Sequence, residues 1–348
     1  MGAIALSPTN IVNNQLTYDK ENTYISMSKY EESPEIMIKR GDVIFVKTGS
    51  TVGKVAYVDK MICKTTLNPQ VVVLKDIKCD NYILSVIMST RNFQNKIQRI
   101  TVGGAVPTLS QVAMGNIFIS LPAAKEQEKI SKFISLLDER ITTQNKIIED
   151  LKKLKCAIIE KLYAEVKGTK YFYRQLFNII NERNKQLEYS NVLSASQEKG
   201  MVSRDDLNLD IQFERSNINT YKIVRNGDYV IHLRSFQGGF AFSEKTGVCS
   251  PAYTILRPNG LLVYGYLSNY FTSRDFVKSL IIVTYGIRDG RSINVDEWLN
   301  MKVIIPSKEQ QTHIVNVIES IENKIKNEET YLNCLTNQKQ YLLRQMFI

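Results

Sequence analysis

Two groups of loop residues in this chain have side chains suited to reading the edges of nucleic-acid bases. Arginine can bond guanine through two N–H groups, glutamine can bond adenine, and hydroxyls bond either bases or phosphates. The candidates in the first part of the chain are Lys47, Thr48, Ser50, Lys54, Gly103, Gly104 and Thr108. Those in the later part are Arg234, Gln237, Arg288 and Arg291. Each residue taken singly could instead be a turn residue or a solvated charge, so the loops are the firmer prediction.

The sequence lacks the motifs that catalysis on DNA would require. It has no Asn/Asp-Pro-Pro-aromatic tetrapeptide for base methylation, no GxxxxGK[ST] phosphate loop and no GxGxxG after a strand. His232 and His313 have no nearby serine or cysteine in a known nucleophile motif. The five cysteines show no CxxC spacing, and two histidines complete no recognisable zinc pattern. We therefore expect no catalytic activity, no metal and no cofactor in this chain.

Length and composition are those of a globular protein. A chain of 348 residues can form two domains with full cores, and a hydrophobic fraction of 43% is ordinary. No stretch approaches the roughly eighteen apolar residues of a membrane helix. The opening MGAIALSPTN also lacks the basic flank and long apolar run of a signal peptide. We expect a cytoplasmic protein without a membrane segment.

The net charge of +10 is unevenly distributed along the chain. Residues 1–120 hold 13 Lys and Arg against 9 Asp and Glu, and residues 167–305 hold 18 against 13. The remaining two segments are almost neutral. An excess of cations attracts a polyanion, because neutralising phosphates releases counterions. A charge of this size could equally serve only solubility.

Two long helices with the same apolar pattern must position these loops. Apolar residues recur in steps of four and three, the period of helices that pack lengthwise. The first seam contains Ile130, Ile134, Leu137, Ile141, Ile148 and Leu151, interrupted by Gln144 and Lys155. The second seam matches it position for position with Ile314, Ile318, Ile321, Ile325, Leu332 and Leu335, interrupted by Glu328 and Lys339. The duplicated seam supplies its own partner within the chain.

The rest of the chain repeats with nearly the same offset. A strand-like run ending in proline precedes each helix, IFISLP from Ile117 and MKVIIP from Met301, and proline suits a first helical turn. The pair Gly41-Asp42 recurs as Gly227-Asp228, and the number of residues between these two pairs is close to the number that separates the two seams. The loops that follow these pairs differ, so the two globular parts share a frame and not a surface. We predict a first domain over residues 1–121, a long helix over 122–167, a second domain over 168–305 and a second long helix over 306–348.

The repeat also predicts a deficit at the start of the first domain. The second domain opens near Lys170 with YFYRQLFNIINERNKQL, and the offset would place the counterpart well before Met1. We expect the first domain to be N-terminally incomplete. A fragment, a misplaced start codon and a recombination product would each account for this.

The ordered, doubled set of motifs resembles the specificity (S) subunit of type I restriction-modification systems over essentially the whole chain. The matching strings are the two Gly-Asp pairs, the loop VGGAVPTLS, the helix beginnings LPAAKEQEKI and IPSKEQQTHI, and the helix ends LKCAIIEKLY and KQYLLRQMFI. The resemblance implies an α+β fold in which two mixed α/β target-recognition domains are separated by two long helices. These helices would pack as an antiparallel coiled coil with an internal pseudo-two-fold repeat.

The resemblance also implies a function and partners. Each domain would read one half of a split, asymmetric site in double-stranded DNA. Two methyltransferase (modification) subunits would dock on the chain, and restriction subunits could join. S-adenosylmethionine, ATP and Mg would then belong to those partner subunits.

Three other interpretations stay open at the level of sequence. The chain could be a recognition fragment of a larger DNA methyltransferase or nuclease, a silent recombination partner of an intact specificity gene, or an adaptor that binds only proteins. Within the seams, Gln144 near Lys339 and Glu328 near Lys155 could set an antiparallel register. Simple tolerance of polar residues in long helices is an equally good explanation.

Overall fold

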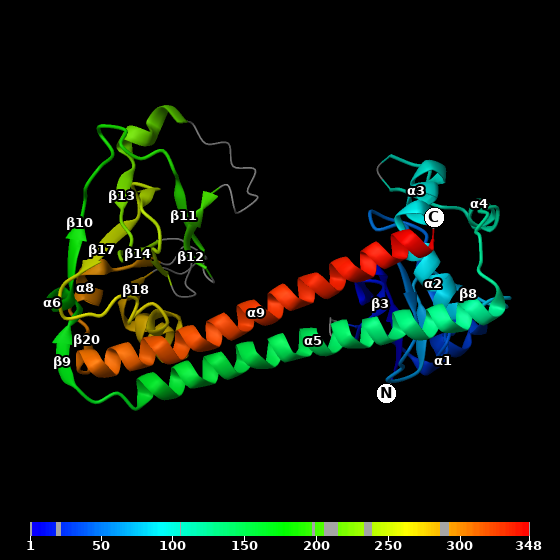
Figure 1. The fold of residues 1–348 in the computed structure, drawn as a ribbon, viewed down its shortest axis with the longest axis horizontal. Coiled ribbons are helices and arrows are strands. Elements are labelled where there is room, and N and C mark those ends of the chain that lie inside the picture. Colours follow the sequence, from blue (N-terminus) through cyan, green and yellow to red (C-terminus); the bar gives the residue numbers. More distant parts are fainter. Residues whose placement is uncertain are drawn as a thin grey trace. The chain divides into compact units, whose positions relative to one another are not determined.

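The computed structural model describes residues 2–18, 22–104, 106–196, 199–204, 215–232, 239–285 and 292–347. The chain divides into two compact units (Figure 1). The first unit comprises Met1–Asn145 with Thr330–Ile348, and the second comprises Lys146–Glu329. Each long helix therefore contributes one half to each unit.

A five-stranded sheet with the order β2-β3-β6-β5-β8 forms the centre of the first unit. Strand β5, which lies between β6 and β8, has the sequence VIFV and is buried throughout, as expected for a continuous apolar run that is covered on both faces. Ile44 and Val46 pack with the three-stranded sheet β4-β1-β7, whereas Val43 and Phe45 face the helices. The strands are β1 (Ala3–Leu6), β2 (Ile11–Val12), β3 (Gln15–Leu16), β4 (Thr23–Ile25), β5 (Val43–Val46), β6 (Val55–Tyr57), β7 (Thr65–Leu67) and β8 (Val71–Leu74).

Short helices complete the first unit. All four begin at N-cap residues, Ser26, Asp80, Thr90 and Ser110, whose side chains each accept a backbone N–H from the first turn. Such caps satisfy donors that a helix cannot pair internally. The helices are α1 (Met27–Glu31), α2 (Asn81–Ser89), α3 (Arg91–Ile100) and α4 (Gln111–Gly115), with 3-10 turns η1 (Pro8–Asn10) and η2 (Pro34–Ile36).

The second unit is built on a four-stranded sheet with the order β10-β17-β14-β15, and four two-stranded pairs accompany it: β11-β12, β13-β16, β18-β19 and β20-β9. Its strands are β9 (Thr169–Phe172), β10 (Phe177–Ile180), β11 (Leu193–Ser196), β12 (Gly200–Ser203), β13 (Lys222–Val224), β14 (Tyr229–Ile231), β15 (Phe240–Phe242), β16 (Gly247–Cys249), β17 (Thr254–Pro258), β18 (Thr284–Tyr285), β19 (Ser292–Ile293) and β20 (Lys302–Ile305). Its helices are α6 (Tyr173–Leu176), α7 (Arg274–Ser279) and α8 (Val295–Leu299), with 3-10 turns η4 (Arg215–Thr220), η5 (Tyr270–Thr272) and η6 (Leu280–Val283).

An aromatic cluster forms the core of the second unit. Trp298 is fully buried, and the ring of Tyr173 stacks on it with the centroids 4.3 Å apart. Phe240 and Phe271 pack against the same indole. The cluster continues onto both long helices through Ile159 of one and Ile314 and Ile318 of the other, so this core holds the domain on the helices.

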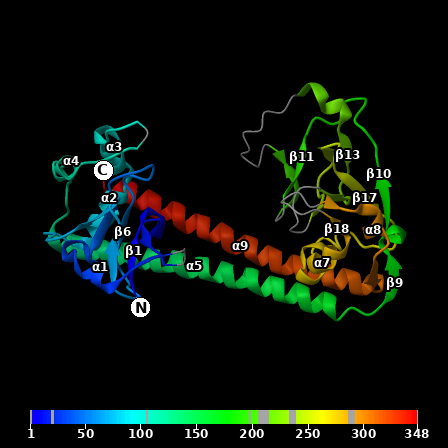
Figure 2. The same cartoon turned by 180° about the vertical axis from the view of Figure 1, so that it is seen from behind.

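The long helices are α5 (Ala124–Ala164) and α9 (Lys308–Met346), and they pack antiparallel in each unit (Figures 1 and 2). In the first unit Lys339, late in α9, pairs with Asp138, early in α5. In the second unit Lys155, late in α5, pairs with Glu322, early in α9, at 2.6 Å. The offset that places Ile130 on Ile314 also places Asp138 on Glu322 and Lys155 on Lys339. The two ion pairs are therefore equivalent in the repeat. The fold class inferred from the sequence, α+β with an antiparallel pair of duplicated helices, is confirmed.

The register pairs differ from those we expected. We anticipated that Lys339 would lie near Gln144 and Lys155 near Glu328, but the structure gives each lysine a carboxylate at another position. Glu328 pairs with Lys324, one turn away on its own helix. A pair on opposite helices depends on their axial alignment, which the seam pattern alone leaves undefined.

The two runs before the long helices also differ from each other. Residues 302–305 form β20, paired with β9, whereas residues 117–121 form no strand. A strand needs a hydrogen-bonding neighbour, and no described segment pairs with residues 117–121. Both prolines lie outside the helices, two residues before each first helical residue.

Two local arrangements are duplicated in the units. In each Gly-Asp turn the glycine has positive φ, +93° at Gly41 and +92° at Gly227, which favours glycine. The carboxylate of Asp42 accepts the Lys39 N–H at 2.9 Å, and that of Asp228 accepts the equivalent N–H at 2.8 Å. The Gly-Asp motif therefore builds a turn.

A buried glutamine fastens each globular domain to the start of its long helix. Gln127 accepts the Asp80 N–H at 2.9 Å and donates to the Pro122 carbonyl at 2.8 Å. Gln311, its counterpart in the repeat, accepts the Val263 N–H at 2.8 Å and donates to the carbonyl of the equivalent proline at 3.0 Å. Neither contact was predicted from the sequence.

Candidate nucleic-acid interface

The structure brings together the two predicted loops of the first domain. The loop of residues 47–54 leaves β5, and the loop of residues 102–110 joins α3 to α4. Thr48 and Thr108 face each other in an isolated antiparallel bridge. The carbonyl of Lys47 accepts a backbone N–H from the second loop at 2.8 Å. Residues far apart in the sequence thus share one surface, which we call the paired-loop surface.

Glycines shape the paired-loop surface. Gly49 and Gly103 have φ of +104° and +109°, a conformation that L side chains rarely adopt. A Cβ at Gly103 would also lie 2.8 Å from the Val106 carbonyl oxygen. Gly104, by contrast, has open space around it and is exposed. The backbone therefore turns tightly at Gly49 and Gly103, and another molecule can approach it closely at Gly104.

The polar side chains of this surface face solvent to different degrees. Ser50 and Thr108 are exposed, whereas Lys47 and Thr48 are half-buried. Among the described residues, no carboxylate forms an ion pair with Lys47. The Lys54 ammonium donates to the Ile11 carbonyl at 3.3 Å and so lies beside the β2 segment.

Helix α3 adds cations that the sequence analysis missed. Its apolar residues Phe93 and Ile97 are buried, while Arg91, Lys96 and Arg99 are exposed on the opposite face. No described carboxylate pairs with these three side chains; Lys96 donates to a backbone carbonyl at 3.0 Å. The helix ends immediately before the loop of residues 102–110. An amphipathic helix whose polar face lacks acids was the signal that could have identified it.

The four candidates of the second domain, Arg234, Gln237, Arg288 and Arg291, lie outside the described residues. The segments that hold their loops are described. β14 and β15 are paired, and His232 donates its backbone N–H to the Gly239 carbonyl at 2.8 Å. β18 and β19 flank the second loop as an antiparallel pair.

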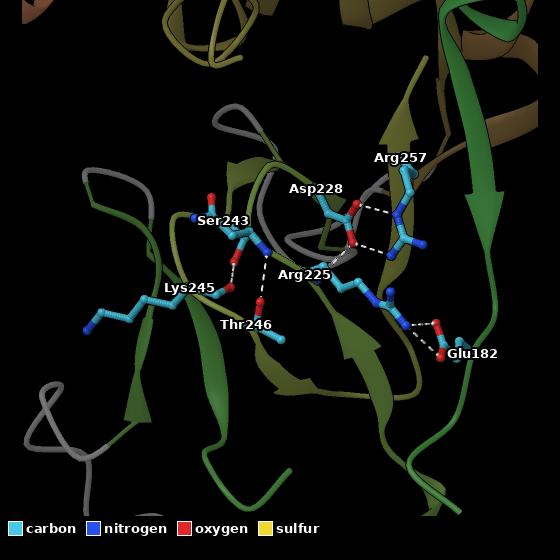
Figure 3. A network of polar contacts seen from close by, with 8 residues as sticks. Glu182, Arg225, Asp228, Ser243, Lys245, Thr246 and Arg257 are labelled. Carbon is cyan, nitrogen blue, oxygen red and sulfur yellow. Dashed lines mark hydrogen bonds and ion pairs between the residues drawn. The ribbon is translucent and has the colours of Figure 1, made fainter. Parts of the chain in front are cut away.

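Figure 3 shows the polar network around the second Gly-Asp turn. Asp228 is almost completely buried, and Arg257 donates to its two oxygens with both distances 2.8 Å. This bidentate bond raises the pKa of the Arg257 guanidinium. Nearby, Arg225 pairs with Glu182 at 3.1 Å, which links the turn to the segment after β10. These cations are already neutralised, and we assign them to the frame of the domain and not to DNA contact.

All twelve predicted seam residues are buried or half-buried. Ile134, Ile148, Ile314 and Ile318 are 1, 6, 2 and 2% exposed. The half-buried members are Ile130, Leu137, Ile141, Leu151, Ile321 and Leu332, and the remaining buried ones are Ile325 and Leu335. The seams therefore face inward in each unit.

No cluster of histidine, cysteine, aspartate or glutamate has the geometry to hold a metal ion within the described part of the chain. No helix among those residues is both long and apolar enough to cross a membrane.

Comparison with known proteins agrees with these features. Residues 7–153 match the family described as the type I restriction modification DNA specificity domain. A curated relative, the type I restriction enzyme MjaVIII specificity subunit of Methanocaldococcus jannaschii, is 29% identical over 131 residues. That match covers 38% of this chain and 30% of the relative, so the chain spans about a third of its length.

Two solved structures share the fold. A chain from a type I R-M system, studied for its complex assembly and conformational transition, aligns with a TM-score of 0.61 at 14% identity and covers 99% of this chain and 91% of its own. The S subunit of a type I restriction-modification system from M. genitalium aligns with a TM-score of 0.54 at 14% identity, over 100% of this chain and 92% of that one. Residues 7–153 are therefore similar to the type I restriction modification DNA specificity domain, and the chain shares its fold with these two solved structures.

Proposed function

We propose that this chain is the DNA sequence-recognition and scaffold subunit of a type I restriction-modification complex. The observation that carries the proposal is the paired-loop surface, where groove-reading side chains lie together with Lys47, which has no described carboxylate partner, on a frame that the second domain repeats. Because the loops of the two domains differ, the two half-sites should differ too. A split, asymmetric recognition site follows.

The scaffold role rests on the long helices. An antiparallel pair with equivalent ion pairs in both units presents similar surfaces twice, which suits the docking of two copies of one partner. We propose that these partners are methyltransferase subunits, and that restriction subunits join the complex. The S-adenosylmethionine, ATP and Mg chemistry then belongs to the partners, and this chain contributes recognition without catalysis in the cytoplasm.

Methylome sequencing tests the proposal directly. Cells would express this chain with its neighbouring methyltransferase gene, and a split methylated motif should appear and should vanish when the chain is deleted. The variant carrying Lys47→Ala and Thr48→Ala should relax or abolish one half of the motif and leave the spacing unchanged. Lys129→Ala, an exposed change on α5, is the matched control. An unchanged methylome on deletion would refute the proposed function.

Salt dependence of binding separates DNA recognition from a purely protein-binding role. In the assembled complex, each lost lysine–phosphate contact should reduce the slope of log affinity against log salt concentration by about 1. Lys47→Ala should show that reduction and Lys129→Ala should not. Binding that does not respond to salt would favour an adaptor that contacts only proteins.

A further inference from the structure

The second domain opens with a segment that completes its core. Residues 169–180 form β9, the single turn α6 and then β10. β9 pairs with β20, Tyr173 of α6 stacks on Trp298, and β10 pairs with β17. One short segment thereby covers two strand edges and the indole between them.

The first domain contains the counterparts of everything that this segment touches. Aligning the seams, with Ile130 on Ile314, places α4 at α8, Met114 at Trp298 and residues 118–121 at β20. The local geometry agrees, since the Ile117 N–H bonds the Met114 carbonyl at 3.2 Å and the Met301 N–H bonds the Trp298 carbonyl at 2.9 Å. The equivalent of β17 is β8, because each pairs antiparallel with the strand after the Gly-Asp turn.

No described residue of the first domain covers those counterparts in the way that residues 169–180 cover theirs. β8 is the last strand of its sheet, whereas β17 lies between β10 and β14. Val112 of α4 is 75% exposed, and Phe118 is 90% exposed. Leu121 is 43% exposed where its counterpart Ile305 is 4% exposed. We call β8, α4 and residues 117–121 the acceptor surface.

We propose that the acceptor surface binds a polypeptide segment with the chemistry of residues 168–180. The segment would add one strand to residues 118–121 and another to the free edge of β8, as extended peptides add to exposed sheet edges. Its aromatic residue in the turn would contact Met114, since a thioether packs well on an aromatic ring. This proposal does not depend on the proposed function.

The repeat defines what such a segment must contain. A Cβ at Gly168 would lie 2.1 Å from the Ile305 carbonyl oxygen, so glycine is required just before the strand. The position equivalent to Tyr173 must be aromatic. The Lys302 ammonium lies over the Phe172 ring, 4.8 Å from its centroid. Phe118 is the counterpart of Lys302 in the repeat. An aromatic residue at the Phe172 position of the bound segment would therefore contact Phe118. These features distinguish the segment from an arbitrary apolar peptide.

The test uses the full chain and a fluorescent synthetic peptide with the sequence of residues 167–183. We expect saturable binding by fluorescence anisotropy. Peptides carrying Gly168→Ala or Tyr173→Ala should bind about tenfold more weakly or worse, as expected when a close contact and its hydrogen bonds are lost. A scrambled peptide should not bind. Equal binding of all four peptides would overturn the proposal.

A variant of the chain tests the acceptor side. Tyr173 donates its N–H to the Met301 carbonyl, and hydrogen-bonded positions alternate along an antiparallel pair, so Val303 is the next bonding position. Its counterpart is Ile119, and Ile119→Pro should abolish binding by removing that N–H. Phe118→Lys, which copies the second domain, is the matched control and should bind.

Hydrogen exchange of the unaltered chain keeps the test decisive if Ile119→Pro fails to fold. Adding the peptide should slow amide exchange in residues 117–121 and 71–74 and should leave residues 302–305 unchanged. Protection confined to any other segment, or no saturable binding, would overturn the proposal.

Discussion

Replacing Gln311 with alanine should destabilise the second unit strongly. The side chain is 1% exposed, accepts the Val263 N–H and donates to the carbonyls of Leu261 and Pro306. Alanine leaves these groups without their partner, and an unsatisfied buried group costs about 1–3 kcal/mol. Leu261 is exposed, so water can replace the partner of its carbonyl. We therefore expect the free energy of unfolding to fall by roughly 2–4 kcal/mol.

The single tryptophan makes the measurement specific to that unit. Trp298 is fully buried in the second unit, so its fluorescence during urea unfolding reports on that unit alone. With a slope of about 2 kcal/mol per molar urea, the midpoint should fall by roughly 1–2 M.

Gln310→Ala is the matched control, because the neighbouring glutamine is exposed and the substitution removes the same atoms. Its effect should stay within about 0.5 kcal/mol. If the two variants unfold at the same urea concentration, the argument that Gln311 fastens the domain to α9 is wrong.

Two further predictions concern charge. Double-mutant cycles should give a coupling energy for Asp138 and Lys339 larger than the roughly 0.2–1 kcal/mol of exposed pairs, since their side chains are only 18 and 21% exposed; a coupling near zero would contradict this. Burial lowers the pKa of His232 below its usual 6.5, so the folded state prefers the neutral ring. Stability is then full above pH 6.5 and declines as the pH falls below it. The urea midpoint should show this decline at pH 5.5, and His232→Asn should weaken the dependence.

The duplication matters most where the two copies differ. The Gly-Asp turns, the buried glutamines and the helical ion pairs are equivalent in the two units. The two units therefore share the same structural frame. The loops of residues 47–54 and 233–238 have different sequences, and the segment of residues 169–180 has no counterpart among the described residues of the first domain. Under the proposed function, divergent loops fit two different half-sites. The acceptor surface is a separate property of the first domain.

Local patterns in the sequence were sufficient for several features. The seam of period 3.5 predicted two long helices, because apolar spacing along one helix is a property of neighbouring residues. The repeated Gly-Asp pair predicted a shared frame. The candidate loops were chosen for their residue types alone, and their role in binding DNA stays a prediction.

Only the tertiary structure decided which distant residues meet. The runs IFISLP and MKVIIP look alike, yet the second forms a strand and the first does not, because β20 has β9 beside it and residues 117–121 have no described neighbour. In the same way, Asp138 and Glu322 became the partners of the seam lysines through the axial alignment of α5 and α9. A helix bonds within itself, so its own sequence specifies it; a strand or an interhelical ion pair is completed by a partner elsewhere in the chain, and sequence spacing alone does not specify that partner.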